Sequence, residues 1–306
     1  MSPYVYLGFI AFVLLMLFVD LRFFNAEPHV QTSKQAGAVV AAWIGLAVAF
    51  GVGLAVVQGA KPAFEYFTGY LIEYSLSVDN MFVFIVIFRY FSVPPQYQHR
   101  VLFFGILGAI VFRGLFIVMG VALLDSFEWI IYVFGALLIL TAIRIAKGTE
   151  EMDPESNPIL KLMQKRFRTT SRYHGQKLFV KEAGRRVGTP LFLVLVIIET
   201  TDIVFAIDSI PAIFAITRDP FIVLTSNVFA ILGLRSLYFL LAGSMTKFHL
   251  LHYGLAVILA FVGVKMILSG FHIHIPILAS LAVIAGVLAT TIFLSLKLPP
   301  KSETND

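Results

Sequence analysis

The sequence contains no cysteine and few charged residues. Without cysteine the chain can form neither a disulfide nor a thiolate metal site. Only 13% of its residues are charged, whereas 59% are hydrophobic and the mean hydropathy is +0.89. Soluble globular domains carry about 25% charged residues. These values exclude a soluble domain and indicate an integral membrane protein.

Long apolar runs fill most of the chain. About 20 apolar residues are needed to cross the hydrocarbon core of a bilayer as a helix. The sequence therefore predicts an all-α, polytopic membrane protein that forms a single membrane domain over residues 1–306. About nine transmembrane helices are predicted, at 4–24, 36–58, 65–91, 100–123, 129–147, 190–217, 221–243, 249–270 and 276–297.

The distribution of lysine and arginine predicts the orientation. The longest connection, 148–189, is strongly basic, and cationic loops stay on the cytoplasmic side. Placing this basic loop in the cytoplasm puts the N-terminus outside and the C-terminus inside. It leaves 17 lysine and arginine residues inside and two, Lys61 and Arg218, outside. The net charge of +5 then reflects this asymmetry, and we expect no nucleic-acid binding.

Two segments of the basic loop have patterns of their own. Residues 157–167, NPILKLMQKRF, place apolar side chains on one helical face, which suits a short helix on the anionic membrane lipids of the inner leaflet. The alternative, which we favour, is a solvated loop that is basic because it lies on the cytoplasmic side. Residues 176–188 are expected to be a short extended piece.

Acidic residues inside the predicted spans recur in an internal repeat. The segment LIEYSLSVDNMFVF at 71–84 aligns with IETTDIVFAIDSIPAIF at 198–214. The alignment sets Glu73 on Asp202, Asp79 on Asp208 and Asn80 on Ser209, and further along it sets Arg113 on Arg235.

Three successive predicted spans are repeated in this way, over about 65–147 and 190–270. An odd number of crossings separates the two copies, so they must face opposite ways across the membrane. Inverted repeats are typical of secondary transporters, whose substrate site lies at the interface of the repeats near the bilayer midplane.

The intramembrane carboxylates outnumber their expected counterions, Arg113 and Arg235. An ionisable group at the bilayer centre costs at least about 2.5 kcal/mol, so some of the acids must be protonated or must hold a cation. Oxygen ligands without cysteine or midspan histidine suit Mn²⁺, Mg²⁺ or Ca²⁺. The predicted metal ligands are Glu73, Asp79, Asn80, Glu199, Asp202, Asp208 and Ser209.

The second copy contains Pro211, which lacks an N–H and so frees the carbonyl of Ile207. A kink or a locally unwound turn there would let Asp202 and Asp208 converge despite their six-residue spacing. Because carboxylates also bind protons, exchange of the metal for H⁺ is the expected coupling. We predict no catalytic site and no cofactor, with the metal as the transported substrate.

Three stretches, EYSLSVDNMFVF, IETTDIVFAIDSIPAIFAIT and NVFAILGLRSLYFLLAG, resemble the TerC family, named after tellurite-resistance operons. The resemblance covers about residues 60–270. It implies a multi-span protein of the bacterial inner membrane that is associated with manganese export and metal homeostasis. It also implies that the acidic residues of the two motifs are the functional ones, while plastid members are linked to thylakoid membrane assembly.

Two other functions compete with transport. A membrane-protein assembly or chaperone-like factor without transport activity would use the basic loop and not the acids. An intramembrane aspartyl protease would let two aspartates of facing helices share a proton. No glycine directly precedes Asp79 or Asp208 in a GxGD-like arrangement, which disfavours the protease.

Overall fold

The computed structural model describes residues 3–19, 32–147, 169–170, 172–182, 185–242 and 250–298. These residues form ten helices and one β-hairpin. The helices are α1 (Pro3–Val19), α2 (Ser33–Gln58), α3 (Ala60–Tyr90), α4 (Pro95–Ser126), α5 (Ile130–Ala146), α7 (Pro190–Phe214), α8 (Pro220–Leu232), α9 (Leu234–Ala242), α10 (Leu251–Gly270) and α11 (Ile277–Lys297). The hairpin pairs β1 (Phe179–Glu182) with β2 (Arg185–Gly188) in antiparallel register.

Each predicted span falls on one helix or, for 221–243, on the pair α8 and α9. Six helices are long and apolar enough to cross a bilayer, and α8 with α9, bent by 41°, would make a seventh. The helices α1 and α5 are apolar but shorter, at 17 residues each. The chain is therefore a predominantly helical, polytopic membrane protein, and the count of nine spans stays a prediction.

Local sequence explains where several helices begin. Pro95, Pro190 and Pro220 open α4, α7 and α8, where a missing N–H costs nothing because the first N–H groups of a helix have no partner in the helix. Asp219 caps α8 by accepting from the Phe221 N–H at 2.9 Å. Gly59, at φ +96°, separates α2 from α3 with a backbone conformation that side chains disfavour.

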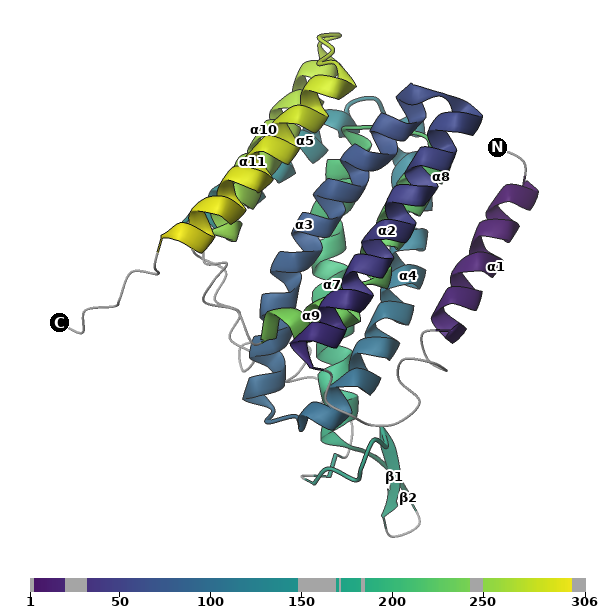
Figure 1. Cartoon of the computed structure of the whole chain (residues 1–306), viewed down its shortest axis with the longest axis vertical. Helices are drawn as coiled ribbons and strands as arrows, with labels where there is room; N and C mark the ends of the chain where they lie inside the picture. Colours follow the sequence, from purple (N-terminus) through teal and green to yellow (C-terminus); the bar gives the residue numbers. More distant parts are fainter. Residues whose placement is uncertain are drawn as a thin grey trace, which may run out of the picture.

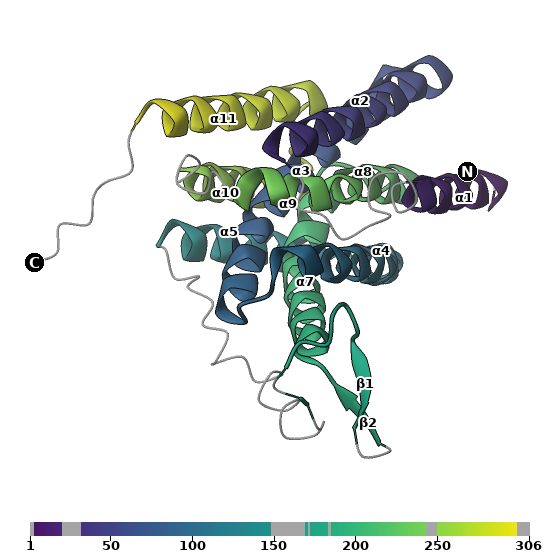
Figure 2. The same cartoon turned by 60° about the horizontal axis from the view of Figure 1, so that its bottom comes forward.

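The helices form two groups (Figures 1 and 2). The helices α5, α10 and α11 lie together on one side, and α1 stands at the opposite edge of the molecule. Within the first group α5 and α10 meet backbone to backbone, since a Cβ added to Gly263 would lie 2.8 Å from the Gly135 carbonyl oxygen. Small residues allow this close approach of membrane helices.

Buried apolar side chains form two cores, and the second includes residues of α3, α4, α7 and α8 as well as α5, α10 and α11. One core joins α1, α2, α3, α4, α7, α8 and α9 and includes packed rings such as Phe50 and Phe229, whose centroids are 4.8 Å apart. The other surrounds α5 and α10, with Leu138 and Leu259 fully buried. Large apolar side chains remain exposed on α1 and α11, as expected for surfaces that face lipid.

The hairpin region docks at the α3–α4 turn. The Tyr173 hydroxyl donates to the Phe91 carbonyl at 2.6 Å, and Gln176 Nε2 donates to the Gln96 carbonyl at 3.3 Å. Burial raises the pKa of Tyr173. The strands confirm the extended piece predicted at 176–188, whereas the helix predicted at 157–167 lies outside the described residues.

Candidate functional site

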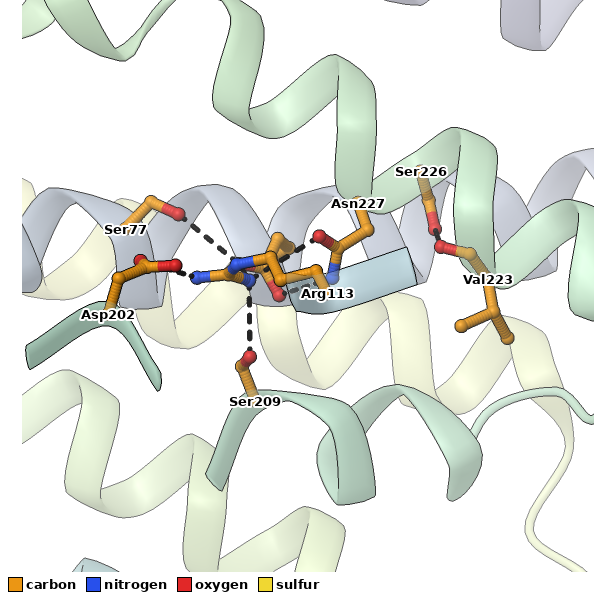
Figure 3. Close-up of polar contacts among 8 residues, drawn as sticks. Ser77, Arg113, Asp202, Ser209, Val223, Ser226 and Asn227 are labelled. Carbon is orange, nitrogen blue, oxygen red and sulfur yellow. Dashed lines mark hydrogen bonds and ion pairs between the residues drawn. The ribbon is translucent and has the colours of Figure 1, made fainter. Parts of the chain in front are cut away.

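Arg113 lies at the centre of a buried polar cluster (Figure 3). It projects from α4, and its side chain is 2% exposed. One terminal nitrogen, Nη1, donates to Glu73 of α3, to Ser209 Oγ of α7 at 3.2 Å and to Asn227 Oδ1 of α8 at 3.4 Å. The other, Nη2, donates to Asp202 Oδ1 of α7 at 3.3 Å. The guanidinium therefore joins its own helix to three others.

Glu73 is fully buried and uses both of its carboxylate oxygens. Its Oε1 pairs with Arg113 and also accepts from Ser77 Oγ, one turn further along α3, at 3.3 Å. Its Oε2 accepts from Asn227 Nδ2 at 3.0 Å. Buried charges are tolerated only when they are paired and hydrogen-bonded. The Asn227 amide contacts both the acid and the base, so it holds the ion pair in register.

Two carboxylate oxygens of α7 are buried and have no hydrogen-bond partner among the described residues, Asp202 Oδ2 and Glu199 Oε2. Glu199 lies one turn before Asp202 and packs against Gly108 of α4, where an added Cβ would overlap its carboxylate. Buried polar atoms are normally satisfied, and exceptions mark places for a water, an ion or a functional group. These oxygens leave acceptor capacity at the edge of the cluster.

Asp202 and Arg235 also line a common cavity of about 20 Å³ between α3, α4, α7, α8 and α9. A cavity of this size holds about one water molecule. Arg235 is 3% exposed and lies in the first turn of α9, directly after the bend at Gly233. Of the two predicted counterions, Arg113 therefore pairs with Asp202 directly, whereas Arg235 shares a cavity with it.

The other predicted ligands are Asp208, Asp79 and Asn80, and Asp208 contacts a different helix. Asp208 is half-buried, and its Oδ1 accepts from Thr141 Oγ1 of α5 at 2.9 Å. Asp79 is half-buried on α3, and its neighbour Asn80 is 7% exposed. No three histidine, aspartate or glutamate side chains in the described ranges are placed to share one metal ion.

The unwound turn predicted at Pro211 is wrong. The helix α7 continues through Pro211 to Phe214. Pro211 is buried in the last turn of the helix, where its missing N–H removes a single hydrogen bond close to the helix end. In a continuous helix Asp202 and Asp208 are about 9 Å apart along the axis and about 120° apart around it. Asp208 therefore faces α5, and the expected convergence of the two acids does not occur.

Sequence reasoning missed two polar residues of the site, Asn227 and Thr141. Both lie in predicted spans, and a buried amide or hydroxyl is costly in lipid for the same reason as a carboxylate. This free-energy cost of a polar side chain inside a span is the sequence feature that could have identified them. It could have singled out Asn227 as a side chain that needs a polar partner, although not which partner.

The fold and the cluster together define a polytopic helical membrane protein with a charged network buried between its spans. The chain belongs to the TerC family of integral membrane proteins, whose family model matches residues 58–303. The resemblance drawn from the three motifs is confirmed at this level.

Similar proteins cover nearly the whole chain. The "Uncharacterized membrane protein STKORF319" of Myxococcus xanthus is 47% identical over 306 residues, which are 100% of this chain and 96% of the relative. The "Putative membrane-bound redox modulator Alx" of Salmonella typhi is 46% identical over 304 residues, 96% of this chain and 94% of the relative.

A plastid relative, the "Thylakoid membrane protein TERC, chloroplastic" of Arabidopsis thaliana, is 48% identical over 267 residues, 87% of this chain and 70% of the relative. No solved structure matches the chain.

Proposed function

We propose that the chain is a secondary transporter that exports a hard divalent cation, Mn²⁺ above Mg²⁺ or Ca²⁺, from the cytoplasm in exchange for protons. One observation carries the proposal. Glu73 and Asp202, the matching acids of the two predicted repeats, meet at one buried guanidinium, and one oxygen of Asp202 has no hydrogen-bond partner within the described part of the chain. Intramembrane acids that face a bundle interior mark ion or proton pathways.

The donor chemistry supports a hard cation. Carboxylate, hydroxyl and amide oxygens surround the cluster, and such ligands suit Mn²⁺, Mg²⁺ and Ca²⁺. We assign Glu73 and Ser209 to the central site and place Asp202 and Glu199 beside it, as acids on the ion's path. Asp79, Asn80 and Asp208 serve as further oxygen ligands along the ion's path, with Arg113 and Arg235 as counterions.

The helix packing agrees with a repeat of three helices. The helix α3 packs on α8, and α7, which begins the second copy, packs on α4. The third helices of the two copies, α5 and α10, pack on each other. This reciprocal pairing is what two related, inverted halves would produce, so it favours a site shared between the halves.

The redox role in the name of the Alx relatives can be related to metal transport. This chain has no cysteine, so it carries no thiol of its own for redox exchange. A change in the supply of a redox-active metal such as manganese is the route by which this chain would affect redox balance.

Transport is tested in vesicles in which the cytoplasmic face of the intact chain points outward. We expect Mn²⁺ to accumulate inside and protons to leave, and Asp202→Asn to reduce the initial rate by about 100-fold or more, since weaker changes around metal sites already cost 10–100-fold. Glu128→Gln, an exposed acid between α4 and α5, is the matched control and should transport normally.

The same vesicles separate transport from the assembly function. If the folded wild-type protein accumulates none of Mn²⁺, Mg²⁺ and Ca²⁺, the proposal fails. An assembly factor is then tested by deleting residues 155–180, which should abolish its function while Asp202→Asn leaves it intact.

A further inference from the structure

The guanidinium of Arg113 occupies a pocket built from oxygen atoms. A single cationic nitrogen, Nη1, is in contact with a carboxylate oxygen of Glu73, the hydroxyl of Ser209 and the amide oxygen of Asn227. These three oxygens come from α3, α7 and α8. They are also the ligand types that bind hard divalent cations in proteins.

We propose that Arg113 is a built-in competitor of the transported cation: its Nη1 fills the ion pocket of Glu73, Ser209 and Asn227 and leaves that pocket when the metal binds. This inference rests on the proposed transport function and adds two roles to it. Asn227 becomes an ion ligand, and Arg113 becomes the group that limits ion affinity and expels the ion.

Electrostatics requires the two cations to alternate. The pocket is closed off from solvent, with Glu73, Ser209 and Asn227 each no more than 1% exposed. Like charges at contact distance repel strongly where water cannot screen them. A divalent cation and the guanidinium therefore cannot both contact Glu73, and binding of the metal requires Arg113 to move.

The structure offers Arg113 a second position. Its Nη2 already contacts Asp202 Oδ1 at 3.3 Å, and Oδ2 of the same carboxylate is buried without a hydrogen-bond partner among the described residues. The Nε atom of Arg113 is also unpartnered there. A rotation towards Asp202 would exchange the contact with Glu73 for a two-point pair with Asp202, the strong geometry for arginine and carboxylate.

Competition of this kind sets the affinity. When a site is free in only a fraction of molecules, the apparent affinity falls by that fraction. If Arg113 fills the pocket in nine molecules of ten, its removal tightens Mn²⁺ binding by about tenfold. The same change slows transport, because no group remains to replace the ion on its release.

The experiment measures Mn²⁺ binding to the purified full-length chain by equilibrium dialysis and Mn²⁺ flux in proteoliposomes. For Arg113→Gln we expect a dissociation constant about tenfold lower than that of the wild type together with a strongly reduced flux. Asn227→Leu, which removes the amide oxygen, should weaken binding. Lys265→Gln is the matched control, because it removes another buried cation that contacts none of the pocket oxygens.

The outcomes distinguish this inference from the function on which it rests. A wild-type protein that binds and transports Mn²⁺, with an Arg113→Gln protein that binds equally or more weakly, overturns the competitor role alone. A wild-type protein that neither binds nor transports Mn²⁺, Mg²⁺ or Ca²⁺ overturns both.

If Arg113→Gln does not fold, Arg113→Lys carries the test. An ammonium is a point charge and cannot span Glu73 and Asp202 as the planar guanidinium does. The dissociation constant of the Arg113→Lys protein for Mn²⁺ should lie between that of the wild type and the tenfold lower value expected for Arg113→Gln. An unchanged constant in the folded Arg113→Lys protein would overturn the inference.

Discussion

Asp202 and Asp208 belong to one helix and one sequence motif, yet they are held in different ways. Asp202 pairs with a buried arginine inside a network that joins α3, α4, α7 and α8. Asp208 accepts one hydrogen bond from a neutral hydroxyl, that of Thr141 on α5. The first contact is ionic and multiply supported, and the second is a neutral hydrogen bond to a neighbouring helix.

The two aspartates differ in the same way in their place in the fold: Asp202 lies in the central Arg113 network, and Asp208 lies at the contact between α7 and α5. The charged network ties together four helices of the larger group, whereas Thr141 and Asp208 connect that group to α5, which lies with α10 and α11 (Figure 1). Removing one partner of a buried ion pair costs about 3–5 kcal/mol. A neutral hydrogen bond contributes about 1 kcal/mol. The Arg113 cluster is therefore expected to hold its helices together more strongly than the Asp208 hydrogen bond does.

The largest effect on stability is expected from Glu73→Gln. The change leaves the guanidinium, 2% exposed, with Asp202 as its single remaining acidic partner in the cluster. The free energy of unfolding should fall by about 3–5 kcal/mol. Denaturant titration of the protein in detergent micelles measures this change, with Glu128→Gln on the exposed α4–α5 turn as the control. A loss below about 1 kcal/mol would mean that the cluster does not act as an ionic centre.

A smaller effect is expected where α4 meets Glu199. In Gly108→Ala the new Cβ would overlap the Glu199 carboxylate, which must move away from its buried position. Overpacking of this kind costs about 1–3 kcal/mol.

Gly114→Ala on the same helix is the matched control for this change. A Cβ at Gly114 would have no other packing neighbour within 4 Å in the described part of the chain, so the variant should gain about 0.5–1 kcal/mol from the better helix propensity of alanine. Unfolding of both variants in micelles measures the difference. Equal stabilities of Gly108→Ala and Gly114→Ala would show that the Glu199 carboxylate does not pack against Gly108.

Much of the fold could be predicted because lipid leaves the backbone few choices. Apolar runs must become helices, since no water is present to satisfy exposed N–H and carbonyl groups. Arg113 and the acids could be singled out because charges in spans are costly and need a reason. The same argument did not reach the partner of each charge, because Glu73, Arg113 and Asn227 are far apart in sequence and only packing brings them together.

The path of the backbone at Pro211 and at Gly233 could not be predicted from the sequence, because neither residue type alone decides whether a helix continues or bends. Pro211 suggested an unwound turn, but a proline near a helix end removes one hydrogen bond and leaves the rest of α7 intact. No bend was predicted at Gly233, although α8 and α9 bend by 41° at this residue. Glycine is common inside membrane helices, so its presence alone does not mark a bend.

The smallest effect tests the peripheral side of the comparison. Thr141→Val removes the hydroxyl that donates to Asp208 but keeps the shape of the side chain, so stability should fall by about 1 kcal/mol. Asp208→Asn keeps an oxygen acceptor for Thr141, so its stability should stay within about 0.5 kcal/mol of the wild type. As Asp208 is proposed to lie on the ion's path, Asp208→Asn should nevertheless lower Mn²⁺ flux in vesicles. Normal Mn²⁺ flux in a stable Asp208→Asn protein would show that Asp208 does not lie on the ion's path. If either variant lost several kcal/mol of unfolding free energy, the Thr141–Asp208 contact would be as important for stability as the Arg113 cluster.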